Sequence, residues 1–110
     1  MATPELKTYF QTFTTDPEGQ IFLTGILNAE AYHQVNVEII PGPQAPANMT
    51  VTCTMGKISG TTLAQIIAQF PLVLTAEIHT FDVIGPEFSI ILTGGPPNTG
   101  VPIQAWVFLH

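Results

Sequence analysis

The sequence reads Met49-Thr50-Val51-Thr52-Cys53-Thr54-Met55 near its middle, and apolar and polar side chains alternate at every step. Successive side chains of a β-strand point to opposite faces, so this alternation predicts a strand with one face in a core and the other toward water. Half-buried strands of this kind belong to antiparallel sheets. The expected fold class is therefore all-β and mainly antiparallel.

The same pattern recurs on both sides of this stretch. On one side, the residues that alternate with polar ones are His33, Val35, Val37 and Ile39. On the other side, Phe88, Ile90 and Leu92 alternate with Ser89, Ile91 and Thr93. Proline and glycine separate segments rich in β-branched and aromatic residues, which is typical of short strands and turns. We expect about seven strands, near residues 6–13, 19–27, 31–40, 48–55, 73–83, 87–93 and 101–109. This spacing predicts a Greek-key or jelly-roll-like β-sandwich.

One segment departs from the period of two. Its apolar residues have the helical spacing i, i+3, i+4, i+7, at Leu63, Ile66, Ile67 and Phe70. Thr62 and Gln65 match a capping box, and Pro71 ends the run. The spacing predicts a short helix near residues 63–69. A buried strand is the competing interpretation, because short apolar runs are ambiguous.

Composition limits both size and partners. A length of 110 residues favours a single domain spanning residues 1–110, with a core that needs no disulfide or metal. The chain is acidic, with a net charge of -6, and only 9% of its residues are charged, against about 25% in a typical protein. Lys7 and Lys57 are the only cations and arginine is absent, so we expect neither nucleic acid nor an anionic membrane as a partner.

The first residues carry no basic stretch followed by a long apolar run, which predicts neither a secretory signal nor a membrane-spanning helix. If the chain is full length, we expect a cytoplasmic protein, and a trimmed secreted chain is the alternative. Cys53 is the single cysteine, which excludes an internal disulfide and a multi-cysteine zinc site.

Catalytic patterns are scarce. Ser59 and Ser89 are the only serines, and neither lies in a Gly-x-Ser-x-Gly motif. Cys53 lies on the apolar face of its strand, where burial raises the pKa of a thiol and makes it inert. We therefore expect a protein that is not an enzyme and needs no cofactor.

Glu77 and His79 are the best local exception. Their spacing places a carboxylate and an imidazole on one strand face, with Asp82 close by, as in metal or acid-base sites. His33 joins them only if the third and fifth predicted strands pair in the right register. Solvated residues on an exposed strand face explain the pair more simply. A small metal-binding protein or metal-dependent enzyme around Glu77 and His79 stays as an alternative.

Two proline- and glycine-rich loops, residues 41–46 and 94–100, are candidate binding loops by position alone. A third segment, Asp16-Pro17-Glu18-Gly19, has the composition of a turn between the first two strands.

The last predicted strand is apolar on both faces. One face holds Val101, Ile103, Ala105, Val107 and Leu109, and the other holds Gln104, Trp106, Phe108 and His110. We expect both faces to be covered, and three hypotheses explain how. Trp106 and Phe108 pack under the predicted helix or a long loop, or form a subunit interface, or make a ligand platform. In the third case Trp106 stacks on a sugar and Gln104 or Asn98 donates hydrogen bonds.

The low charge favours self-association, because an isolated small sandwich needs a more charged surface to stay soluble and to protect its edge strands. We therefore expect a non-enzymatic β-sandwich that forms a homo-oligomer or binds a protein partner. A lectin-like module with a carbohydrate ligand is the main alternative.

Overall fold

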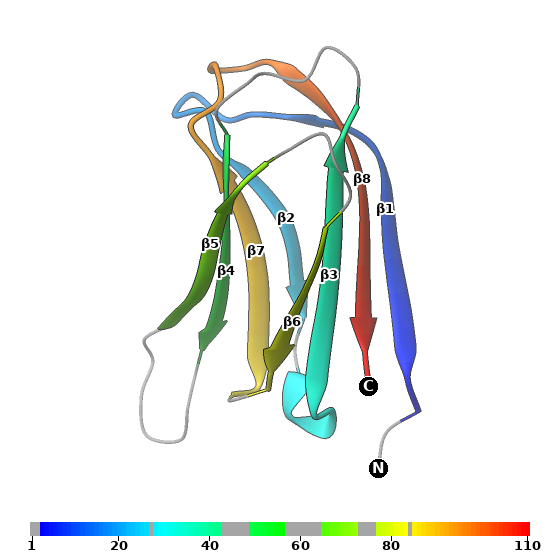
Figure 1. Cartoon of the computed structure of the whole chain (residues 1–110). Helices are drawn as coiled ribbons and strands as arrows, with labels where there is room; N and C mark the ends of the chain where they lie inside the picture. The colour runs from blue at the N-terminus through cyan, green and yellow to red at the C-terminus, as the bar shows by residue number, and fades with distance from the viewer. Residues whose placement is uncertain (1–2, 27, 43–48, 57–64, 73–76, 84) are drawn as a thin grey trace.

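The described part of the chain folds into two four-stranded antiparallel sheets packed face to face (Figure 1), as seen in a computed structural model. The structure describes residues 3–26, 28–42, 49–56, 65–72, 77–83 and 85–110. The elements are β1 (Glu5–Thr14), β2 (Ile21–Ile26), the 3-10 turn η1 (Ala29–Ala31), β3 (Gln34–Pro41), β4 (Thr50–Gly56), β5 (Gln65–Pro71), β6 (Ile78–Asp82), β7 (Glu87–Thr93) and β8 (Gly100–Leu109).

Sheet A has the strand order β1-β8-β3-β6, and sheet B has the order β2-β7-β4-β5. Each strand of one sheet is followed along the chain by a strand of the other sheet, except where β4 and β5 pair directly as neighbours. This eight-stranded, two-sheet order is that of a jelly roll. The expected antiparallel β-sandwich is therefore confirmed, and the strand order narrows it to its jelly-roll form.

The predicted helix near residues 63–69 is wrong for the part that the structure describes, because β5 pairs there with β4. Residues 63 and 64 lie outside the described residues. The register between the two strands shifts, so that Cys53 is opposite Ala68 while Thr54 is opposite Ile66. Ile67 is thus the extra residue of a β-bulge, which moves later side chains to the other face.

The bulge also explains the misleading sequence pattern. Ile67 and Phe70 both pack against the core although they are three residues apart, a spacing that an unbroken strand does not allow. With β5 included, the structure has eight strands where about seven were expected. The predicted strand over residues 73–83 is shorter in the structure, where β6 starts at Ile78, and residues 73–76 lie outside the described residues.

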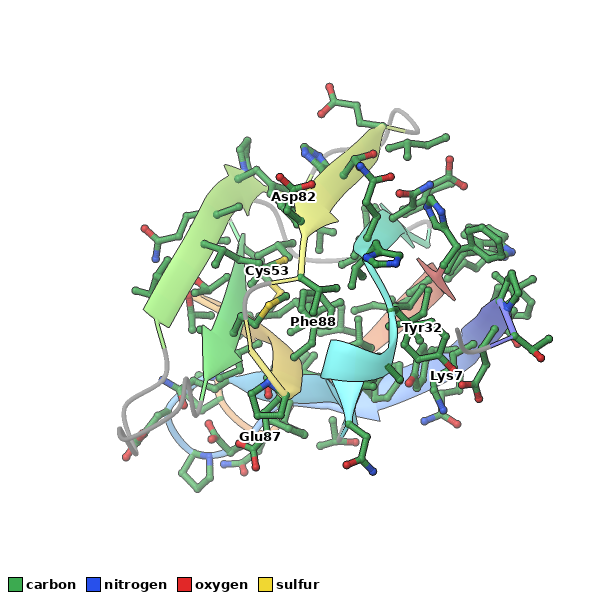
Figure 2. All side chains as sticks on the ribbon, turned by 90° about the horizontal axis from the view of Figure 1, so that it is seen from below. Lys7, Tyr32, Cys53, Asp82, Glu87 and Phe88 are labelled. Atoms are coloured by element: carbon green, nitrogen blue, oxygen red, sulfur yellow. The ribbon has the colours of Figure 1, made fainter. Side chains whose placement is uncertain are left out.

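Apolar side chains from both sheets fill the space between them. Figure 2 shows Cys53 and Phe88 in this interior. The buried positions alternate along four strands, at Val35, Val37, Ile39, Val51, Cys53, Met55, Phe88, Ile90, Leu92, Val101, Ile103, Ala105, Val107 and Leu109. The core faces expected from the alternating segments are therefore confirmed. Each large apolar side chain contributes about 1.5–3 kcal/mol by leaving water, so this interior supplies most of the folding free energy.

Candidate functional site

The outer face of sheet A is the surface on which the two-sided last strand lies. The register places side chains in rows across the four strands, because residues directly opposite one another in an antiparallel pair share a face. The outer face consists of Leu6, Thr8, Phe10 and Thr12 from β1, Pro102, Gln104, Trp106 and Phe108 from β8, Gln34, Asn36, Glu38 and Ile40 from β3, and Ile78, Thr80 and Asp82 from β6.

Large apolar side chains are exposed on this face. The exposed fractions are 58% for Leu6, 55% for Phe10, 68% for Ile78 and 36% for Phe108. The outer face of sheet B has a different character, because three threonines of β4, at positions 50, 52 and 54, lie along its middle. Phe22 and Ile66 are exposed there on opposite edges of the sheet, β2 and β5, so the threonines of β4 lie between them. In sheet A, by contrast, Leu6 and Phe10 of β1 adjoin Phe108 and Trp106 of the neighbouring strand β8. Sheet A therefore carries the more continuous apolar surface.

Trp106 lies half-buried in the middle of this surface. The ring of Phe10 on β1 meets its indole edge-on, with centroids 5.0 Å apart and an interplanar angle of 66°. Phe108 stacks on His110, with centroids 4.9 Å apart. The predicted helix does not cover Trp106, because that segment forms β5 in the opposite sheet. Within the described residues, cover by an α-helix is thus not the explanation of the two-sided strand.

Two hollows open onto the outer face of sheet A. The first has a volume of about 190 Å³ and is lined by Asn36, Val37, Glu38, Ile78, Trp106 and Phe108. The second has a volume of about 280 Å³ and is lined by Phe10, Gln11, Thr12, Gly42, Pro102, Ile103 and Gln104. Glu38 is the carboxylate of the first hollow, and it lies in one row between Trp106 and Ile78.

The structure brings Gln104 near Trp106 but leaves Asn98 apart from it. Gln104 is exposed on the same face of β8, two positions along the strand, which is about 7 Å. Asn98 precedes Gly100 at the start of β8, and Trp106 lies about 20 Å further along that strand. The combination of Trp106 and Asn98 on one sugar ring is therefore not supported by the geometry.

Asn98 belongs to a hydrogen-bonded corner between the loop of residues 94–99 and the turn that follows β1. Thr15 is buried there, where its hydroxyl donates to the Pro96 carbonyl (2.6 Å) and accepts from the Thr99 amide (2.8 Å). The Asn98 amide donates to the carbonyl of Asp16 (3.2 Å). These bonds give the loop a structural role, because they join it to the turn that follows β1. The other candidate loop, residues 41–46, falls mostly outside the described residues.

Glu77 and His79 do contact one another, with 3.6 Å between His79 Nε2 and Glu77 Oε2. The imidazole also stacks on Phe70 of the opposite sheet, with centroids 3.7 Å apart. Asp82 is on the other face of β6 from His79, because its position in the strand has the opposite parity.

His33 does not reach this pair. Its carbonyl accepts a hydrogen bond from Val83, whereas His79 is opposite Val37, about 13 Å further along the strand. Among the described residues, no group of three or more His, Cys, Asp or Glu side chains is placed to hold a metal ion. The stack on Phe70 gives His79 a structural role, linking the two sheets where β5 and β6 form their edges.

The remaining nucleophiles offer little chemistry. Cys53 is buried, and burial raises the pKa of its thiol to about 12, so the reactive thiolate is almost absent near neutral pH. Ser89 lies half-buried on β7, and Ser59 is outside the described residues. Within the described residues there is also no helix of the length and apolarity needed to cross a membrane.

Comparisons with known proteins bear on the fold. No protein-family model and no curated protein matches the chain. Among solved structures, the Yersinia pseudotuberculosis-derived mitogen is similar with a TM-score of 0.55 and 11% identity, over 97% of this chain and 86% of the mitogen. A structure of the infectious bursal disease virus Gx strain matches with a TM-score of 0.44 and 13% identity, over 98% of this chain and 32% of the viral chain. The likeness is one of fold. The likeness to the mitogen, at 11% identity, supports the β-sandwich and no particular activity.

Sequence reasoning identified Trp106 and Phe108 but missed Leu6, Phe10 and Ile78 on the same face. A usable signal was present in the first strand, where Leu6 and Phe10 alternate with Tyr9 and Phe13, so both faces of that strand are apolar. The same two-sided pattern singled out the last strand. Because β1 pairs with β8, the outward-facing apolar residues of the two strands form one surface.

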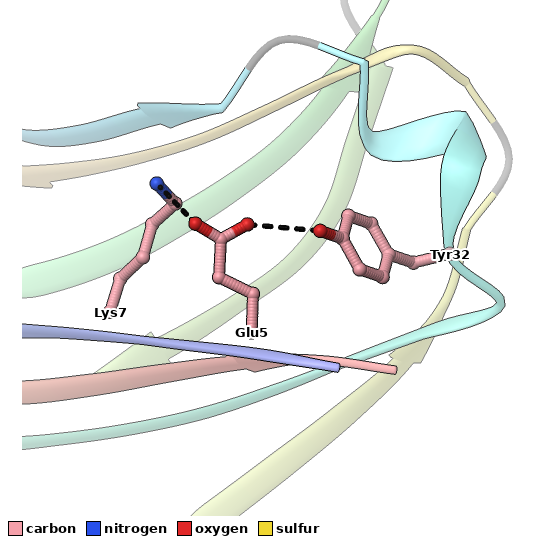
Figure 3. Close-up of polar contacts among 3 residues, drawn as sticks. All are labelled: Glu5, Lys7 and Tyr32. Atoms are coloured by element: carbon pink, nitrogen blue, oxygen red, sulfur yellow. Dashed lines mark hydrogen bonds and ion pairs between the residues drawn. The ribbon is translucent and has the colours of Figure 1, made fainter. Parts of the chain in front are cut away.

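One polar cluster ties β1 to η1 (Figure 3). The hydroxyl of Tyr32 donates to Glu5 Oε2 (2.9 Å), and Lys7 Nζ lies 3.3 Å from Glu5 Oε1. The hydrogen bond from Tyr32 is the largest cause that lowers the pKa of Glu5, and the hydrogen bond and charge of Lys7 lower it further. The same bond from Tyr32 to Glu5 raises the pKa of Tyr32. A carboxylate with a lowered folded-state pKa stabilises the fold above its unfolded value of about 4.5, and this contribution is lost as pH falls through the folded value.

We predict that Tyr32→Phe moves the pKa of Glu5 up toward its ordinary value, because the largest cause of its depression is removed. An NMR titration of the Glu5 side-chain carboxyl carbon measures this directly. Lys7→Gln should raise the same pKa as well, because it removes the charge of the ammonium group beside Glu5. A Glu5 titration curve unchanged by Tyr32→Phe would contradict the hydrogen bond in Figure 3.

Proposed function

We propose that this protein is a non-enzymatic β-sandwich module that self-associates through the outer face of sheet A. One observation carries the proposal: Leu6, Phe10 and Phe108 are exposed around the half-buried Trp106 on two adjacent strands. Soluble monomers rarely expose contiguous apolar patches larger than about 300–600 Å², and larger ones mark interaction sites. Aromatic side chains are also enriched in the buried centres of interfaces.

The distribution of charge favours a second copy of this chain as the partner. The ionisable carboxylates of the outer face, Glu38 and Asp82, lie on β3 and β6, and the half formed by β1 and β8 carries no charged residue. A two-fold axis through the β1–β8 half would keep the carboxylates of both copies off the axis, on the β3–β6 side of each copy. Two molecules of net charge -6 can then approach without like charges facing each other at the centre of the contact.

The size of the face is also adequate. β8 is ten residues long, about 33 Å, and four strands spaced about 4.8 Å apart span about 19 Å. β3 and β6 are shorter, with eight and five residues, so the flat area is about 500 Å². The accessible area is larger, of the same order as the roughly 800 Å² that each partner buries in a standard interface. Among the described strands, β1 forms the edge of sheet A next to this face, so an edge contact can add to it.

Sedimentation velocity over a wide range of protein concentration tests the proposal. We expect a monomer at low concentration that shifts reversibly to a dimer or larger closed oligomer as concentration rises. A single monomeric species across the whole range would rule the proposal out. From the charge, we still predict that the protein binds neither nucleic acid nor an anionic membrane. The lectin-like alternative, with a carbohydrate ligand, also stays a prediction.

A further inference from the structure

The hollow beside Trp106 combines aromatic walls with an acidic group. Trp106 and Phe108 line it from β8, Ile78 from β6, and Asn36 and Glu38 from β3. Such a hollow offers apolar surface, the π-faces or edges of two aromatic rings and one carboxylate within a single volume of about 190 Å³. Aromatic rings attract cations through their quadrupole, and a carboxylate adds a direct charge.

Glu38 lacks an internal counter-ion in the part of the chain that the structure describes. Lys7 is committed to Glu5 on the other face of β1, and no ion pair of Glu38 occurs among the described residues. Glu38 is half-buried, in a row with Trp106 on one side and Ile78 on the other. A carboxylate between apolar side chains is stabilised by a cation that carries apolar groups, because the cation neutralises the charge while its apolar groups contact the neighbouring side chains.

We propose that this hollow binds the ammonium group of an organic cation, held against Trp106 and Phe108 and paired with the carboxylate of Glu38. The chemistry fits an alkylated ammonium better than a metal ion, since aromatic and aliphatic walls supply no hard ligands. Asn36 also lines the hollow, and its Oδ1 lies 3.3 Å from His110 Nε2. The net charge of -6 attracts cations of any source toward the molecule.

Two sources could supply the same group: a free quaternary ammonium compound and a methylated lysine of another protein. Trp106 is the only tryptophan of the chain, so its fluorescence reports on the hollow without labelling. Choline and a peptide with one trimethyl-lysine serve as probes, titrated at a protein concentration below the onset of self-association. Sodium chloride at matched ionic strength corrects for salt, and the carbon isostere of choline, which lacks the charge, corrects for apolar contact.

We expect saturable quenching of Trp106 emission by at least one of the two cations and none by sodium chloride. Glu38→Gln should weaken binding by about tenfold, because it removes the paired charge while keeping the shape. Asp82→Asn is the matched control, since it removes one carboxylate from the same outer face at a position that does not line the hollow. Its affinity should stay within about twofold of the parent.

The outcomes separate the possibilities. Response to choline assigns a small-molecule ligand, and response to the peptide alone assigns a modified protein. Equal quenching by the neutral isostere, an unchanged affinity of Glu38→Gln, or no saturation with either cation would overturn the inference. Glu38→Gln should self-associate at least as strongly as the parent, because it removes negative charge from the face that a second copy approaches. Weaker cation binding by a variant that still self-associates therefore tests the cation site apart from the self-association.

Discussion

Gly19→Ala is expected to destabilise the fold by about 3 kcal/mol, which lowers the melting temperature by about 10–20 °C in a domain of this size. Gly19 has a φ of 76°, in the left-handed region that costs an alanine about 1–2 kcal/mol. A Cβ at this position would lie 1.9 Å from the carbonyl oxygen of Gly95, which is backbone and cannot rotate away. Relief of this overlap must separate the turn from the loop of residues 94–99.

The separation also breaks hydrogen bonds. The Gly95 amide donates to the Gly19 carbonyl (3.1 Å), and the buried Thr15 depends on the same corner for its partners. Gly25→Ala is the matched control, because its Cβ would come close only to the ring of the exposed Phe22, which can move, and would lie at an ordinary 4.0 Å from Ser89 Oγ. We expect that control to change stability by less than about 1 kcal/mol. Equal melting temperatures for the two variants would show that the corner is not packed as described.

Phe10→Glu is expected to weaken self-association by at least about 30-fold, because a residue at the centre of an interface typically contributes 2 kcal/mol or more. Phe10 meets the indole of Trp106 and has no charged residue near it on the β1–β8 half of the outer face. A carboxylate placed there would be buried without a partner at the contact. The monomer should keep its stability within about 1 kcal/mol, since the side chain is 55% exposed.

Phe22→Glu makes the same chemical change on the opposite sheet. Phe22 is 62% exposed on β2, and the substitution alters the net charge of the chain by the same amount. Overall repulsion between copies is therefore matched in the two variants. Sedimentation velocity of both, side by side, should show loss of the oligomer for Phe10→Glu alone. Loss of the oligomer for Phe22→Glu alone would show that the interface lies on sheet B instead.

Much of the fold was predictable because most strands keep one face in the core. The alternation over residues 49–55 and 88–92 reports directly on burial, and both segments have the predicted faces. The turn over residues 16–19 was predictable for a local reason. Asp16 Oδ1 accepts from the amides of Glu18 and Gln20, each at 2.9 Å, as a turn aspartate does.

The parts that were missed depend on contacts between distant segments. β5 looked helical because a bulge at Ile67 shifts the alternation, and the bulge exists only in the pairing with β4. The order of strands in a sheet depends on which strands pair with each other, and a local sequence pattern does not encode that pairing. The same holds for the site, where Trp106 was visible as a two-sided residue but its neighbours Phe10 and Glu38 come from strands far away in sequence.

The exposure of Trp106 to a soluble quencher, measured as protein concentration rises, tests the proposed self-association most directly. As the only tryptophan, Trp106 gives an unambiguous signal from the outer face of sheet A. The Stern–Volmer constant for acrylamide should fall as the oligomer forms, in step with the sedimentation shift, and should stay high for Phe10→Glu. A quenching constant that stays unchanged while the oligomer forms would show that a second copy does not cover this face.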